Sequence, residues 1–165
     1  TAAIGSLRGP LHGGANEAAM EMIEDWTSPE QAESEILGML ARKDKIMGFG
    51  HAIYSESDPR NTIIKKWSEK LAAEVGDTTL YPVSVRCEEV MWREKKLFCN
   101  ADFFHASAYH FMGIPTKLFT PIFVMSRLTG WAAHVKEQRA NNRIIRPSAD
   151  YTGPETSTWV DIADR

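Results

Sequence analysis

Apolar residues recur at helical spacing along most of this chain, and this pattern constrains its fold more than any other feature. From Ala15 to Trp26, small and apolar side chains fall on one helix face. Similar stripes begin near Ala32, Pro59 and Tyr81, the last of them running to about Leu97. Nowhere do strand and helix patterns alternate, as a parallel sheet would require. The sequence therefore predicts an all-α fold.

Helix start and stop signals divide the chain further. Ser28 before Pro29 predicts a capped helix start, and so does Asp58 before Pro59. Gly76 predicts the end of the second of these helices. A short helix is expected after Asn100, with its end at Gly113. The inward face of the helix at 59–75 is expected to carry Ile63, Ile64, Trp67 and Leu71.

A sixth helix, from about 116 to 138, is apolar on nearly all sides. Such a helix is usually buried on most sides, often by a partner subunit. Arg127 interrupts it, and because an unpaired buried guanidinium is costly, we expect this side chain to meet an anion. That anion is either a carboxylate of the chain or a carboxylate or phosphate of a ligand. The polar remainder, 139–165, predicts an extended tail with at most a short strand at 144–145.

Charge and hydropathy argue against two classes of partner. The net charge of −3 argues against nonspecific binding to nucleic acid and to an anionic membrane surface. The apolar run from 118 to 135 is interrupted by Pro121, Arg127 and His134, which favours a buried helix over a membrane span. We therefore expect neither nucleic acid nor membrane as a partner.

The motifs of several common sites are missing from the sequence. The two cysteines, Cys87 and Cys99, have neither disulfide-framework nor metal-ligand spacing, which favours a reduced, cytoplasmic compartment. His105 and His110 are not placed to ligate a metal from one helix face, so we expect no metal site. Neither a glycine-flanked serine elbow nor a phosphate-binding glycine loop with lysine occurs.

Two histidines are set among glycines. His12 lies in Gly-Pro-Leu-His-Gly-Gly-Ala-Asn-Glu (9–17), directly before a helix, and His51 follows Gly-Phe-Gly (48–50). Glycine permits tight turns, and a helix start offers unpaired N–H groups to negative charge. Each histidine could therefore face a ligand that carries or develops negative charge. The alternative is a capped loop–helix junction whose histidine only packs.

Three charged residues each have two interpretations. Arg60 opposes the dipole of its own helix, so it either binds an anion or is solvated at the surface. Asp102 follows Asn100 in an aromatic setting, so it is either a helix cap or a general base whose basicity is raised by burial. Arg146 is either exposed to solvent or packs, with its flanking isoleucines, on a neighbouring subunit.

Together these motifs resemble the citrate synthase superfamily over essentially the whole chain. The matching segments are 7–17, 48–52, 58–60, 100–102, 119–121, 127 and 130–131. Within the superfamily the chain is most similar to the 2-methylcitrate synthase branch, through segments 90–92, 130–134, 137–139 and 144–149. The resemblance implies condensation of propionyl-CoA with oxaloacetate and water to 2-methylcitrate and CoA, in propionate catabolism. The alternative is a citrate synthase of the tricarboxylic acid cycle, which uses acetyl-CoA.

The resemblance also implies a role for each candidate residue. His12 would stabilise the enol or enolate of the acyl-CoA, Asp102 would remove its α-proton, and His51 would donate to the ketone of oxaloacetate. No cofactor would be tightly bound, because the CoA thioester is a substrate. The arginines implied to bind the oxo-acid carboxylates are Arg60, Arg127 and Arg146, the last reaching the other site of a homodimer. The segment implied to contact CoA comprises Lys45, Ile46, Met47, Gly48 and Phe49.

Finally, the resemblance implies a division into domains. Residues 1–12 would end a large domain, 13–113 would form the small domain, and 114–165 would return to the large domain with a dimer helix and a tail. The chain starts at Thr1 and family members are much longer, so we expect a piece that is inactive by itself. Ser55 departs from the family where some members carry a basic residue near the CoA phosphates. The alternative of another class is an isolated domain with a purely structural role.

Overall fold

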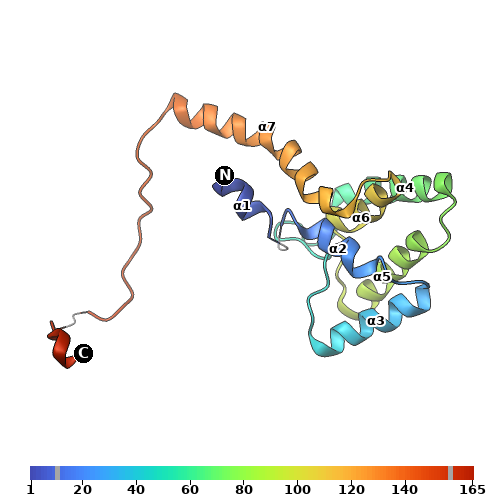
Figure 1. Ribbon diagram of the computed structural model, residues 1–165, viewed down its shortest axis with the longest axis horizontal. Helices are drawn as coiled ribbons and strands as arrows, with labels where there is room; N and C mark the ends of the chain where they lie inside the picture. Colours follow the sequence, from blue (N-terminus) through green and yellow to red (C-terminus); the bar gives the residue numbers. More distant parts are fainter. Residues whose placement is uncertain (10–11, 156–157) are drawn as a thin grey trace. The chain divides into compact units, whose positions relative to one another are not determined.

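The computed structural model describes residues 1–9, 12–155 and 158–165 of the chain, and it is built from helices (Figure 1). The only β pairing among the described residues is an isolated antiparallel bridge between Phe49 and Cys99. The predicted all-α fold is therefore confirmed. The α-helices are α1 (Ala2–Leu7), α2 (Ala15–Ile23), α3 (Pro29–Arg42), α4 (Pro59–Val75), α5 (Leu80–Lys95), α6 (Ala101–Phe111) and α7 (Phe119–Ala140). Short 3-10 turns lie at Thr116–Leu118 (η1) and Ile162–Asp164 (η2).

The helix boundaries follow the capping chemistry of the sequence. The Ser28 side chain accepts a hydrogen bond from the backbone N–H of Gln31 (3.2 Å) and so starts α3. Asp58 starts α4 in the same way, and Gly76 ends that helix in the left-handed conformation, with φ +73°. The predicted starts at 29 and 59 and the predicted stop at 76 are confirmed. The short helix α1 lacks a side-chain cap, and no sequence signal predicted it.

The chain forms two compact units, residues 1–131 and 132–165, and each is described by itself. In the first unit α4 packs on α6, α3 packs on α5, and α2 packs on α6 (Figure 1). Completely buried side chains from α2, α3, α5 and α6 meet in one core, which places the start of α6 against the rest of the unit. The largest of these side chains are Met20, Ile23, Ile36, Val83, Val90, Phe103 and Phe104, with Phe119 from α7.

The predicted inward face of α4 is wrong at two positions. Ile63 is 62% exposed and Trp67 is 54% exposed, whereas the buried residues of α4 are Ser68 and Ala72. The physical reason is that α4 approaches α6 through small side chains, and the Ser68 hydroxyl shares a 2.7 Å hydrogen bond with the Ser107 hydroxyl. The apolar stripe of α4 therefore lies beside the face that contacts α6, and not on it.

The sixth predicted helix is less buried than expected. It begins as the turn η1 and continues as α7, of which only Phe119 and Thr120 are buried. Met125 and Leu128 are more than half exposed, because the described chain covers only the first turn of α7. The tail has no strand at 144–145, where one was allowed for. None of the described helices is long and apolar enough to cross a membrane.

Candidate active site

A short loop pairs with the segment that leads into α6 and so places His51. The backbone N–H of Asn100 donates to the carbonyl of Gly48 (2.9 Å), and the N–H of Gly50 donates to the carbonyl of Phe98 (2.8 Å). Gly48 has φ +85°, and a Cβ built on it would lie 2.7 Å from the Cβ of Phe103. Only glycine fits there, since both the conformation and the close approach exclude a side chain. The loop is thereby held against the start of α6.

His51 is oriented by the turn that follows it. Its Nδ1 accepts hydrogen bonds from the backbone N–H groups of Ile53 (3.1 Å) and Tyr54 (3.3 Å). The ring also stacks on Tyr54, with 4.6 Å between the ring centroids. Because Nδ1 is the acceptor, a neutral ring carries its proton on Nε2. His51 is exposed, so this Nε2–H is available to a ligand.

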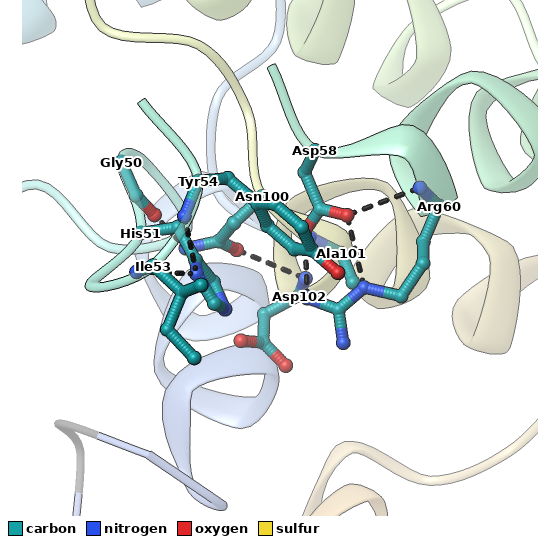
Figure 2. A network of polar contacts seen from close by, with 9 residues as sticks. All are labelled: Gly50, His51, Ile53, Tyr54, Asp58, Arg60, Asn100, Ala101 and Asp102. Atoms are coloured by element: carbon teal, nitrogen blue, oxygen red, sulfur yellow. Dashed lines mark hydrogen bonds and ion pairs between the residues drawn. The ribbon is translucent and has the colours of Figure 1, made fainter. Parts of the chain in front are cut away.

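Asp102 lies in the first turn of α6, but it does not cap that helix. The cap is Asn100, whose side-chain oxygen accepts from the backbone N–H of Asp102 (3.0 Å). The Asp102 carboxylate has no hydrogen bond or ion pair with the described residues, and Figure 2 shows it projecting away from the network around it. Burial raises the pKa of Asp102, whereas the charges of Arg60 and His12 lower it. The group is an unpaired, half-buried carboxylate suited to accept a proton.

Arg60 is paired with a carboxylate of its own helix cap (Figure 2). Oδ1 of Asp58 accepts from the backbone N–H of Arg60 (3.0 Å) and from its Nε (2.9 Å), and Oδ2 accepts from Nη2 (2.7 Å). Oδ2 also accepts from the backbone N–H of Ala101 (2.9 Å), which joins the first turns of α4 and α6. These bonds, above all those from the Arg60 side chain, hold the pKa of Asp58 below its usual value. No hydrogen bond joins Nη1 of Arg60 to the described residues, and the guanidinium carbon lies 5.7 Å from the centroid of the Tyr54 ring.

His12 completes a cluster with these residues. It is an exposed residue of the turn before α2, and its ring meets Phe123 of α7 edge-on, with 5.4 Å between centroids. Two neighbours in its motif, Pro10 and Leu11, lie outside the described residues. The charge of His12 acts on the Asp102 carboxyl, as do those of Arg60 and His51. The residues that the structure brings together are His12, His51, Arg60 and Asp102.

The two remaining candidate arginines lie elsewhere. Arg127 is half-buried, and its guanidinium carbon lies 4.9 Å from the centroid of the Phe123 ring, a cation–π contact. No carboxylate within the described part of the chain pairs with it. Arg146 lies in the exposed tail of the second unit. Of the two anions expected for Arg127, a carboxylate of the described chain is therefore not found.

The residues of the segment 45–49 differ in their exposure to solvent. Lys45 is exposed, whereas Ile46 and Gly48 are buried. Met47 and Phe49 are half-buried, and Phe49 packs on Phe103 with 4.7 Å between ring centroids. Lys45 is thus the one exposed residue of the segment.

The other histidines and cysteines have ordinary surroundings. His105 stacks on Tyr109, with 5.3 Å between centroids, and burial lowers its pKa. Cys87 and Cys99 are buried free thiols, and burial raises the pKa of Cys87 to about 12. Within residues 1–9, 12–155 and 158–165, no cluster of His, Cys, Asp and Glu could hold a metal ion.

Sequence patterns missed the second contacts of two helix caps. Asp58 was recognised as a cap, but not as the partner of Ala101, 43 positions away. Asn100 was noted beside Asp102, but its side-chain N–H also donates to the carbonyl of Gly50 (2.9 Å), 50 positions away. No local signal encodes either contact, because capping preferences describe neighbouring residues only.

Several known proteins are similar to this chain in sequence and fold. Residues 1–148 match the C-terminal domain of citrate synthase. Over its whole length the chain is 72% identical to the 2-methylcitrate synthase of Shewanella oneidensis and 51% identical to citrate synthase 2 of Bacillus subtilis, and it covers 44% of each. A ternary complex of carboxymethyl coenzyme A and oxaloacetate with the citrate synthase of Thermoplasma acidophilum is 36% identical. Its TM-score is 0.82, over 96% of this chain and 44% of that one. The chain thus spans less than half the length of these relatives, and it belongs to the citrate synthase family.

Proposed function

We propose that the full product of the gene encoding this chain condenses propionyl-CoA with oxaloacetate and water to give 2-methylcitrate and CoA. Support comes from membership of the citrate synthase family and from the 72% identity to a 2-methylcitrate synthase. A citrate synthase that uses acetyl-CoA is the second candidate, favoured by the 51% identity to citrate synthase 2 of Bacillus subtilis. Both reactions need the same proton transfers and differ by one methylene of the acyl group.

The Asp102 carboxylate is the observation that carries this proposal. A base that removes a proton from the carbon next to a thioester works best when its pKa lies above that of an ordinary carboxylate, and burial raises the pKa of Asp102. The Nε2–H of His51 would donate to the ketone oxygen of oxaloacetate as that oxygen gains charge. His12 would donate to the thioester oxygen and stabilise the enol or enolate.

Further parts of the proposal rest on the family pattern. Arg60 and Arg127 bind carboxylates of the oxo acid, Arg146 reaches into the other site of a homodimer, and the segment 45–49 contacts CoA. Residues 13–113 form the small domain of a cytoplasmic enzyme of propionate catabolism. The 165-residue chain is inactive alone, because the described residues leave α7 largely uncovered and give Arg127 no anionic partner.

The test is a steady-state assay of CoA release by the purified full gene product, with oxaloacetate and either acyl-CoA. We expect kcat/KM for propionyl-CoA to exceed that for acetyl-CoA by about 10–200-fold, since one methylene contributes about 1–3 kcal/mol. A preference for acetyl-CoA would instead identify a citrate synthase. No CoA release with either thioester would overturn the proposal. Turnover by the 165-residue chain alone would overturn its predicted inactivity.

A further inference from the structure

Asn100 uses all of its polar groups to join the two catalytic segments (Figure 2). On the loop side, its backbone N–H donates to the carbonyl of Gly48 and its side-chain N–H donates to the carbonyl of Gly50. The distance between donor and acceptor is 2.9 Å in both bonds. On the helix side, its side-chain oxygen accepts from the N–H of Asp102 (3.0 Å) and its carbonyl accepts from that of Phe103 (3.4 Å). One side-chain amide therefore bonds both to Asp102 and to the residue directly before His51.

The choice of asparagine at this cap is informative. Ser, Asp and Asn cap helices about equally well, because capping requires only an acceptor. Ser28 and Asp58 fill that role at α3 and α4. Of these three residues, only asparagine combines the acceptor with a pair of N–H donors in one planar group. The bond to Gly50, and not the capping of α6, is what distinguishes Asn100 from a serine or an aspartate.

We propose that Asn100 is a positioning residue that sets the separation of His51 and Asp102, an inference that rests on the proposed function. In that reaction His51 polarises the ketone of oxaloacetate, and Asp102 removes a proton from the acyl-CoA. The two carbon atoms that form the new bond therefore meet between these side chains. A displacement of about 1 Å at such a site can cost roughly 100-fold in rate. Among the described residues, no other side-chain hydrogen bond joins the loop to the start of α6, where Phe49 also packs on Phe103.

The test compares cap-preserving variants in the full gene product. Asn100→Ser keeps the acceptor for Asp102 and removes the donor to Gly50. We expect kcat to fall about 10–100-fold, with KM for oxaloacetate changed less than about 3-fold, since Arg60 is untouched. Asn100→Asp, nearly identical in shape, places an oxygen against the Gly50 carbonyl and is expected to reduce kcat further. It also provides the test if the serine variant folds poorly.

Ser28→Ala is the matched control, because it removes the cap of α3, which packs on α5. We expect it to lower Tm at least as much as Asn100→Ser and to leave kcat unchanged. Amide exchange should accelerate at Gly50 in the Asn100 variants and stay unchanged there in Ser28→Ala. If kcat of Asn100→Ser stays within 2-fold of an active wild type, or if Ser28→Ala loses as much activity, the positioning role is overturned. A wild type inactive with both thioesters overturns the proposed function instead, and the exchange data then decide whether Asn100 holds the loop.

Discussion

The candidate site has two halves, and the chain completes one far more than the other. The first half consists of the loop at 48–51 and the first turns of α4 and α6. There, Asp58 and Asn100 bind backbone and side-chain groups on both sides of the site. The second half consists of His12 and Arg127 of the same unit, whereas Arg146 belongs to the other unit, residues 132–165. Within the described chain, His12 and Arg127 contact the Phe123 ring, and Arg146 is exposed in the tail.

This difference separates groups that are prepared for proton transfer from groups that await other surfaces. Preorganised donors and bases accelerate a reaction because they need no rearrangement when charge develops. In the proposed reaction, His51 and Asp102 would meet that requirement inside this chain. Arg127 has no anionic partner among the described residues, and it lies on a helix whose apolar residues Met125 and Leu128 are exposed.

The largest effect is expected at Asp102. Asp102→Asn retains the shape of the side chain and removes the base, so kcat of the full gene product should fall by about 10³-fold, within the range for general bases. Asp77→Asn makes the same chemical change at the start of α5, where Asp77 accepts from the backbone N–H groups of Leu80 and Tyr81. That control should leave kcat unchanged. Equal losses in both variants would show that the first half of the site is not where the proton is taken.

The two arginines should differ in their effects on stability. Arg60→Gln leaves the completely buried Asp58 carboxylate without its ionic partner, and we expect the free energy of unfolding to fall by about 1–3 kcal/mol. Arg127→Gln removes only a cation–π contact, worth about 0.5–1 kcal/mol. Both variants should raise KM for oxaloacetate. Urea unfolding of each variant beside the wild type measures the difference. Equal losses of stability would remove the distinction between the two halves.

Local chemistry was the part of this structure that the sequence could predict. The starts of α3 and α4 follow from a cap directly before a proline, and the stop of α4 follows from a glycine directly after its last residue. A raised pKa of Asp102 was one of two interpretations drawn from its aromatic neighbours, and burial is the main cause of the rise. Which face of α4 is buried was not predictable from apolar spacing, because the Ser68–Ser107 contact depends on α6.

Contacts between distant segments were beyond the sequence patterns. Asp58 to Ala101 and Asn100 to Gly50 join segments more than forty positions apart, and neither residue looks different from an ordinary cap. The convergence of His12, His51, Arg60 and Asp102 came from a family resemblance, because spacing in one chain does not report separation in space. The burial of α7 was predicted from the composition of the helix alone. Burial depends also on the surfaces that pack against a helix, and the described chain buries only Phe119 and Thr120 of α7.

The smallest effect is a pH dependence at Asp58. Because its pKa in the folded state is lowered, chiefly by the Arg60 side chain, the carboxylate stabilises the fold above its ordinary pKa. That contribution disappears as the pH falls through the lowered pKa. Asp58→Asn keeps the cap of α4 but removes the charge, so we expect a loss of about 1 kcal/mol at pH 7. Measured by urea unfolding, the gap between the variant and the wild type should close as the pH is lowered below the ordinary range of an aspartate.

Arg60→Gln serves as the matched variant for this titration, since it removes the main cause of the low pKa and leaves the carboxylate in place. In Arg60→Gln the acid-induced loss of stability should begin at a higher pH than in the wild type. The Asp58→Asn change also removes a negative charge that raises the pKa of Asp102, so the acid limb of kcat should move to lower pH. A constant gap in stability across the pH range would mean that Asp58 acts only as a hydrogen-bond acceptor. The first half of the site would then be stabilised by hydrogen bonds alone, without the charge pairing that distinguishes Arg60 from Arg127.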